Sequence, residues 1–186
     1  VLGNNLGIDL TDKLGLHYFG SEKFHYGQFI TYMFMHGGIM HILLNMLGLW
    51  MFGSQMENYW GGKRFLIFYI VCGVGAAITH YTIYYFNTYH LIHGIDTYLK
   101  NPDTQSLSAV MELIKPIPTS EGLPELENVY SQLKAAISRN DEAAILNASV
   151  EFLAMYKTGY LNAPVVVGAS GAIYGILLAY GMTFPN

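Results

Sequence analysis

A serine between two glycines is the first feature of this sequence that suggests chemistry. Gly168-Ala169-Ser170-Gly171 opens an apolar stretch, and Gly175 follows one helical turn later. Glycines let a backbone or a substrate approach closely, and a serine at the start of a helix lies beside unpaired backbone N–H groups. An oxyanion needs such donors, so Ser170 is a candidate nucleophile. A serine in an apolar helix also commonly bonds the preceding turn, and Gly171-x-x-x-Gly175 is equally typical of a helix-packing face.

A second polar group lies in the earlier run His36-Gly37-Gly38-Ile39-Met40-His41-Ile42-Leu43-Leu44-Asn45. His41 and Asn45 are four residues apart, so they share one face of a helix. Polar side chains inside an apolar helix are costly and are usually functional. A neutral histidine donates one hydrogen bond and an asparagine amide donates two, which suits an oxyanion site. We expect His36, which precedes two glycines, in the loop at the mouth of this helix.

These polar residues allow two other interpretations. A metal site is disfavoured because His36 and His41, five residues apart, are expected on different helix faces, no carboxylate is nearby, and the zinc-protease pattern with Glu after the first His is absent. We therefore expect no metal and no cofactor. A simple polar contact between helices remains an alternative for His41 and Asn45.

The composition places these residues in membrane-spanning helices. Charged residues make up only 12% of the chain and hydrophobic residues 52%, and three long stretches carry no Asp, Glu, Lys or Arg. A membrane helix needs about 20 mostly apolar residues. The expected spans are Phe29–Phe52, Phe65–Tyr85 and Pro164–Phe184, and a short turn is expected from Gly53 to Gly62. The net charge of −4 gives no basic surface for nucleic acid.

The spans divide the chain into four segments, whose order implies an all-α, multi-pass membrane protein. They are an extramembrane segment at 1–28, two transmembrane helices within 29–86, an extramembrane helical insert at 87–160, and a transmembrane helix with the candidate nucleophile at 161–186. Positive charge in a short loop marks the cytoplasmic side, so Lys63-Arg64 is expected in the cytoplasm and the insert outside.

The insert itself is expected to be helical. Leu126, Val129, Leu133 and Ile137 repeat at helical spacing. Asn140 and Asp141 then offer a cap for a second amphipathic helix.

The two motifs, in this order, resemble those of the rhomboid family of intramembrane serine proteases: His36-Gly37-Gly38-x-x-His41-x-x-x-Asn45 and, later, Gly168-Ala169-Ser170-Gly171. Glu57, just after the first span, also fits the family pattern. The resemblance implies a six-helix core, of which the three spans look like the second, third and fourth helices. It also implies that residues 1–35 match a family loop that lies partly in the membrane.

The resemblance also implies roles for individual residues. Ser170 matches the nucleophile. His41 and Asn45 match side chains that form the oxyanion hole together with the Ser170 backbone N–H. Tyr174 matches an aromatic residue that packs against the catalytic histidine. Gly168, Gly171 and His36 are supporting residues.

The sequence also departs from the family pattern. Gly27-Gln28 replaces a frequent Trp-Arg pair, and the insert is longer than the usual connection. The family's general base is a histidine on the sixth helix, which we expect to lie outside this truncated chain. We expect His80 to be a satisfied buried histidine and not a substitute base. We also expect missing helices to pack against Gly171 and Gly175.

The sequence therefore predicts an intramembrane serine endopeptidase that cleaves transmembrane proteins with a Ser-His dyad. The 186-residue chain alone is expected to be inactive, and the protein is expected in a bacterial inner membrane. Its partners would be transmembrane substrates and the lipid bilayer. One alternative is a non-catalytic rhomboid-like protein that binds membrane clients. Another is a small transporter, although transporters often carry internal repeats, and none is visible.

Overall fold

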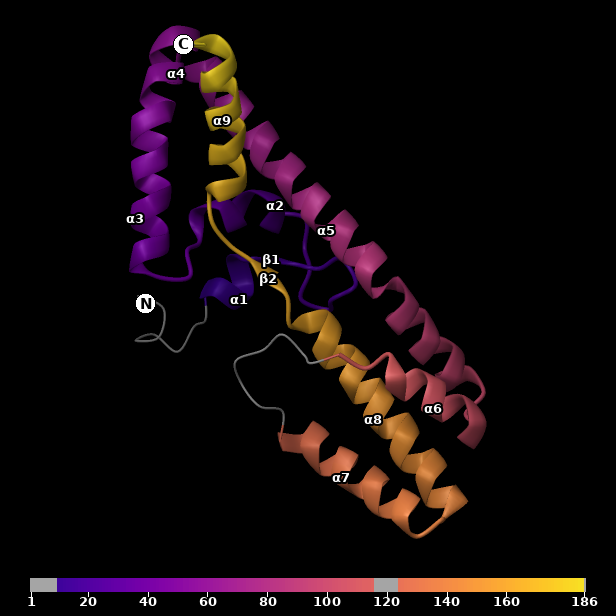
Figure 1. The fold of residues 1–186 in the computed structure, drawn as a ribbon. Coiled ribbons are helices and arrows are strands. Elements are labelled where there is room, and N and C mark those ends of the chain that lie inside the picture. The colour runs from indigo at the N-terminus through magenta and orange to yellow at the C-terminus, as the bar shows by residue number, and fades with distance from the viewer. Residues whose placement is uncertain (1–9, 116–123, 186) are drawn as a thin grey trace. The chain divides into compact units, whose positions relative to one another are not determined.

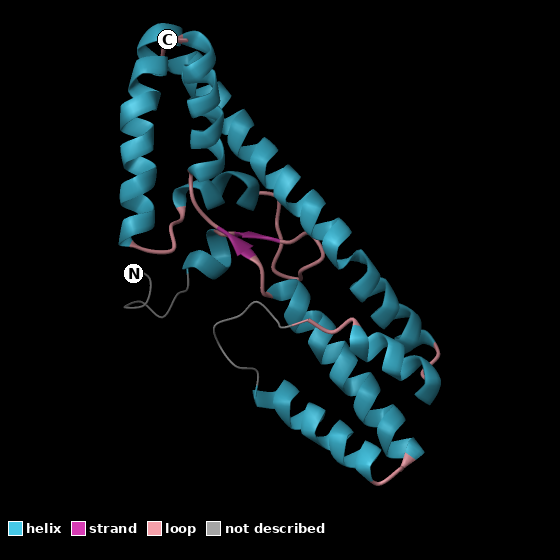
Figure 2. Cartoon of the chain, in the orientation of Figure 1, coloured by secondary structure: helices cyan, strands magenta, loops and turns pink. Residues whose placement is uncertain are grey.

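The computed structural model describes residues 10–115 and 124–185, which form two compact units. The first unit contains residues 10–82 and 165–185, and the second contains residues 83–164. Helices dominate both units (Figures 1 and 2), as the sequence predicts. The first nine residues of the expected 1–28 segment, and residues 116–123 of the expected insert, lie outside the described residues.

The first long helix of the chain consists of three consecutive pieces. These are α3 (Ile39–Gly48), a π-helical stretch at Leu49–Gly53, and α4 (Ser54–Trp60). Together they form a helix of 22 residues that is long and apolar enough to cross a membrane. Two shorter elements precede it, α2 (Gln28–Thr31) and a 3₁₀ turn at Tyr32–Phe34.

The boundaries of this helix differ from the predicted span Phe29–Phe52. Met35 and Gly38 have extended backbones, which separate the 3₁₀ turn from α3 and move the start of the long helix to Ile39. At the other end, the expected turn from Gly53 to Gly62 is helical as far as Trp60. The chain reverses at Gly61, whose φ of +81° favours glycine.

α5 (Gly62–Lys100) is a single helix of 39 residues and the second candidate membrane span. It contains the predicted span Phe65–Tyr85 but continues far into the segment that the sequence assigned to the insert. The extension is stabilised by Leu91, Ile95 and Tyr98, which are buried in the core of the second unit. Polar composition alone does not reveal this tertiary packing.

The last helix, α9 (Ser170–Thr183), is shorter than the predicted span Pro164–Phe184. Its 14 residues fall below the roughly 20 that cross a bilayer. The residues before it are extended, because β2 (Val165–Val166) pairs antiparallel with β1 (Leu16–His17). Among the described residues, two helices are of spanning length, and the third expected span is not confirmed.

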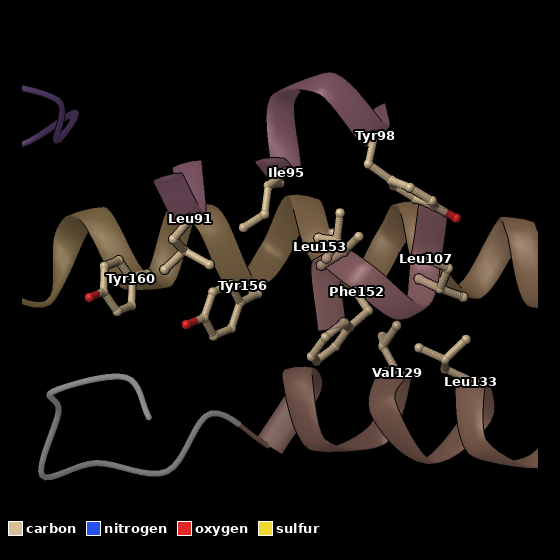
Figure 3. Close-up of a cluster of buried hydrophobic side chains, with 11 residues drawn as sticks. Leu91, Ile95, Tyr98, Leu107, Val129, Leu133, Phe152, Leu153, Tyr156 and Tyr160 are labelled. Atoms are coloured by element: carbon tan, nitrogen blue, oxygen red, sulfur yellow. The ribbon is translucent and has the colours of Figure 1, made fainter. Parts of the chain in front are cut away.

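The second unit is a helical domain with its own hydrophobic core. The end of α5 packs with α6 (Thr104–Glu112), α7 (Pro124–Ser138) and α8 (Glu142–Asn162). Figure 3 shows side chains from all four helices meeting in this core. The two predicted amphipathic helices correspond to α7 and α8, and Asp141 caps α8 by accepting from the Ala144 N–H. The sequence reasoning missed α6, which Asp103 caps in the same way.

A buried glutamine organises the segment between α1 (Leu10–Leu14) and α2. The Gln28 Oε1 atom accepts hydrogen bonds from the backbone N–H groups of His17 and His25, each 3.2 Å away. Its Nε2 donates to the carbonyl oxygens of Lys23 (3.0 Å) and Lys13 (3.3 Å). One side chain therefore satisfies four backbone groups of the segment, at the place where the family pattern frequently has a Trp-Arg pair.

Replacing Gln28 with leucine is expected to destabilise this segment. Gln28→Leu removes four hydrogen bonds and leaves buried backbone groups unpaired, so unfolding should become easier by roughly 1–3 kcal/mol. Gln55→Leu is the matched control, because the exposed Gln55 amide contacts only the Met51 carbonyl. The measurement is thermal unfolding in detergent, and equal midpoints for the two variants would contradict the role given to Gln28.

Candidate functional site

The loop 35–38 sets the position of the first candidate residues. His36 lies in this loop, as the sequence indicated, and its ring meets the ring of His41 edge to face, with centroids 5.3 Å apart. The expectation that His36 and His41 would face apart was wrong, because the extended backbone at Met35 and Gly38 turns His36 back toward α3. Burial and the neighbouring His41 hold the pKa of His36 below its ordinary value.

The protonation of His41 follows from its neighbour in the loop. The Gly37 backbone N–H donates a hydrogen bond to His41 Nδ1, at 3.3 Å. A nitrogen that accepts a hydrogen bond carries no proton, so the neutral imidazole holds its proton on Nε2. His41 Nε2 is therefore a hydrogen-bond donor.

Asn45 lies one helical turn further along α3 and is buried. Its Nδ2 group has no hydrogen-bond partner within the described part of the chain. A buried amide donor without a partner costs roughly 1–3 kcal/mol, and such groups in native structures require an explanation. A ligand oxygen that enters the site only during reaction would provide the missing acceptor.

Gly168 brings the second motif against both of these side chains. A methyl group added at Gly168 would lie 2.6 Å from His41 Nε2 and 3.5 Å from Asn45 Nδ2. The residue also has a φ of +113°, a conformation that side chains with a Cβ rarely adopt. Only glycine fits here, and its absence of a side chain lets the turn before Ser170 pass directly over the two donors.

A backbone hydrogen bond holds this turn in place. The Gly168 N–H donates to the Tyr32 carbonyl oxygen at 2.9 Å. The buried Tyr32 hydroxyl in turn donates to the Gly73 carbonyl oxygen of α5, at 2.8 Å. Tyr32 thus links the turn to α5. The sequence reasoning missed this residue, since a backbone carbonyl leaves no signal in a sequence.

Ser170 is the first residue of α9. Backbone N–H groups in the first turn of a helix have no partner within the helix, and the helix dipole is positive there. The residue before it, Ala169, offers no side-chain cap. The Ser170 hydroxyl forms no hydrogen bond with any of the described residues. The hydroxyl and the N–H groups beside it are therefore available to a ligand.

Glycines also allow α9 to pack closely against α5 and α3. A methyl group at Gly171 would lie 2.6 Å from Ala76 Cβ, and one at Gly175 would lie 2.4 Å from Cys72 Sγ. α9 therefore packs closely on α5, which corrects the expectation that missing helices cover these two glycines. On the other side, a methyl group at Gly48 of α3 would lie 3.1 Å from Ile173 Cγ2.

The remaining candidate residues lie away from the place where Gly168 meets His41 and Asn45. Tyr174 is 72% exposed, one helical turn after Ser170. His80 is exposed on α5, not buried as expected, and its ring contacts Tyr81. Within the described ranges, no three His, Cys, Asp or Glu side chains gather in a way that would hold a metal ion.

Comparison with known proteins matches residues 23–95 to the family model described as the Rhomboid domain. RHOMBOID-like protein 6, mitochondrial, of Arabidopsis thaliana is 36% identical over 59 residues, which cover 32% of this chain and 18% of that protein. Rhomboid protease GluP of Bacillus subtilis is 35% identical over 52 residues, covering 28% of this chain and 10% of GluP. RHOMBOID-like protein 4 of Arabidopsis thaliana is 41% identical over 44 residues, which cover 24% of this chain and 11% of that protein.

These matches cover less than a fifth of the length of each relative. No solved structure matches the chain. The family match and the apolar helices indicate an integral membrane protein, and relatives from a plant and a bacterium indicate no particular membrane. The family match includes His36, His41 and Asn45 and ends before Gly168. Residues 23–95 therefore match the rhomboid family.

Proposed function

We propose that this chain carries the nucleophile and the oxyanion site of an intramembrane serine endopeptidase. The observation that carries the proposal is the approach of Gly168 to His41 Nε2 and Asn45 Nδ2, immediately before Ser170. The turn that leads into Ser170 therefore lies against two side-chain donors, and the N-terminus of α9 follows two residues later. The rhomboid match over residues 23–95, and a relative named as a rhomboid protease, support the same reaction class.

The reaction would follow the general serine-protease scheme. The Ser170 oxygen attacks the scissile peptide carbonyl carbon while a general base removes the hydroxyl proton. The carbonyl oxygen becomes an oxyanion that accepts hydrogen bonds from the Ser170 N–H, His41 Nε2 and Asn45 Nδ2. Collapse of this intermediate expels the amine, which takes the proton from the base. Water then hydrolyses the acyl-enzyme and regenerates Ser170.

The general base is assigned to a histidine outside these 186 residues. The face of α9 that continues from Ser170 is open among the described residues, since Tyr174 and Leu178 are 72% and 66% exposed. A further helix packed on this face would bring a histidine beside Ser170, with Tyr174 against its ring. The substrate would be a transmembrane protein, and the two long apolar helices support this part of the proposal.

The rival functions make different demands on Ser170. A client-binding protein does not need the Ser170 hydroxyl, and a transporter needs neither a nucleophile nor an oxyanion site. Neither rival explains why a buried amide donor without a partner and an Nε2-protonated histidine converge beside a helix N-terminus.

Ser170→Ala in the full-length protein should abolish cleavage of a transmembrane substrate. Losses on removal of a serine-protease nucleophile are on the order of 10⁴-fold to 10⁶-fold, and labelling by a fluorophosphonate probe should disappear. Ser54→Ala is the control, because the Ser54 hydroxyl only bonds the Trp50 carbonyl within its own helix. The 186-residue chain alone should be inert, and robust Ser170-dependent cleavage by it would show that the base lies within the chain.

Asn45→Leu should separate a catalytic donor from a structural residue. Losing one oxyanion donor costs about 10²-fold to 10³-fold in kcat, and the loss should be smaller than for Ser170→Ala because two donors remain. Leucine has a similar size and removes a buried polar group without a partner, so thermal stability should stay equal or rise by about 1 kcal/mol. Asn58→Leu on the exposed face of α4 is the control. A large loss of stability with unchanged kcat would refute the assignment.

Gly168→Ala should lower both stability and activity, because the new methyl group meets the His41 ring in a conformation that disfavours a Cβ. A cost of about 1–3 kcal/mol is expected from backbone strain and overpacking. Combining it with His41→Ala removes the collision and should recover part of the stability without recovering activity. Gly181→Ala, where a methyl group meets nothing within 4 Å, serves as the control. Additive stability losses in the double variant would place Gly168 away from His41.

A further inference from the structure

α5 is much longer than a membrane crossing requires. Its 39 residues extend about 58 Å at 1.5 Å per residue, whereas the hydrocarbon core is about 30 Å thick and takes about 20 residues. Counted from Lys63 and Arg64, such a crossing ends near Tyr84. The sequence nevertheless stays without Asp, Glu, Lys or Arg as far as Ile95. The helix therefore contains an uncharged stretch beyond the hydrocarbon.

That stretch carries an exposed group of residues, which we call the aromatic–histidine stripe: Phe86, Tyr89, His90 and His93. Their spacing of three and four residues puts them on one face of α5. Phe86 is 68% exposed and Tyr89 is 44% exposed, and both histidines are exposed. The Tyr89 ring stacks on the His93 ring, with centroids 5.6 Å apart.

The second unit does not use this stripe for its own folding. Its core takes Leu91, Ile95 and Tyr98 from α5 (Figure 3), and the spacing of these residues puts them on another face of the helix than the stripe. The core of the second unit therefore leaves the stripe as an open aromatic surface.

A second aromatic group marks the opposite end of the crossing. Tyr59 and Trp60 end α4, where Tyr59 contacts Phe184 and Trp60 contacts Phe68, with ring centroids 5.6 and 5.0 Å apart. Lys63 and Arg64 follow directly. Aromatic residues collect at both interfaces of a membrane, and basic residues flank the spans. The two aromatic groups are separated along α5 by about 20 apolar residues, or about 30 Å, the thickness of one hydrocarbon core.

We propose that the aromatic–histidine stripe lies in the lipid headgroup layer, at the end of α5 away from Lys63. Its partner is the bilayer itself. The rings of Phe86 and Tyr89 would rest at the boundary with the acyl chains, and the Tyr89 hydroxyl and the two imidazoles would bond lipid phosphate and ester oxygens. The stripe fixes the depth of α5, and with it the depth of the residues that α5 contacts. This inference rests on the membrane placement of α5 in the proposed function.

The depth of four positions on one face of α5 tests the proposal. Thr79, Phe86, His90 and Thr97 are all exposed and follow one another at spacings of seven, four and seven residues. Each is replaced singly by cysteine in a Cys72→Ala background and carries a nitroxide label. The protein is reconstituted in phosphatidylcholine vesicles. Electron paramagnetic resonance then measures collisions with oxygen, which concentrates in the hydrocarbon, and with a water-soluble nickel chelate.

The proposal expects a graded profile. Thr79 should collide mainly with oxygen and Thr97 mainly with nickel. Phe86 and His90 should fall between them, with nickel collisions several-fold below those at Thr97. If Phe86 and His90 equal Thr97, the stripe is in water and the proposal is overturned while the membrane placement survives. If both are shielded from oxygen and nickel alike, a protein surface covers them and the proposal also fails. If Thr79 itself equals Thr97, the membrane placement of α5 fails, and the proposed function fails with it.

Discussion

The hydrogen bond from the Gly168 N–H to the Tyr32 carbonyl oxygen joins the two parts of the proposed site. It connects a turn before α9 to a turn before α3, segments that lie far apart in the sequence. The Tyr32 hydroxyl extends the link to α5 through the Gly73 carbonyl. Because Gly168 has no side chain, this bond can form while the turn lies against His41 and Asn45. The position of Ser170 is a consequence of that arrangement.

The surroundings of the site show why its open donors are informative. In an apolar environment, polar groups are satisfied within the chain wherever possible. Thr79 and Thr82 donate to carbonyl oxygens one turn back, and Tyr81 donates to the Leu16 carbonyl. In the Gln28 amide, the oxygen accepts hydrogen bonds and the nitrogen donates them. Against that background, the Asn45 Nδ2 group is one of three buried side-chain nitrogens without a partner in the described chain, together with His17 Nδ1 and His36 Nε2. A polar group retained at such a cost favours a functional interpretation over a structural one.

The sequence predicted the parts of this structure that depend on local pattern. The helical repeat from Leu126 to Ile137 and the cap at Asp141 gave α7 and α8, because both signals are contained within a few residues. The pairing of His41 with Asn45 followed from helical periodicity. The break at Met35, the length of α5 and the short α9 could not be predicted in the same way. The length of α5 and the start of α9 depend on tertiary contacts, those of Leu91 and Ile95 with the second core and of β1 with β2, and no local pattern indicates the extended backbone at Met35.

The proton on His41 is the most direct test of the proposed oxyanion site. Nitrogen NMR of histidine-labelled full-length protein, with His41 assigned by its loss in His41→Gln, identifies which ring nitrogen is protonated. The geometry of the Gly37 N–H predicts a neutral ring with the proton on Nε2 and a bare Nδ1. Phosphonylation of Ser170, which places a polar phosphoryl oxygen in the site, should then shift the Nε2 proton strongly. A proton on Nδ1, or an Nε2 signal that ignores the adduct, would contradict the role of His41 as a donor to the oxyanion.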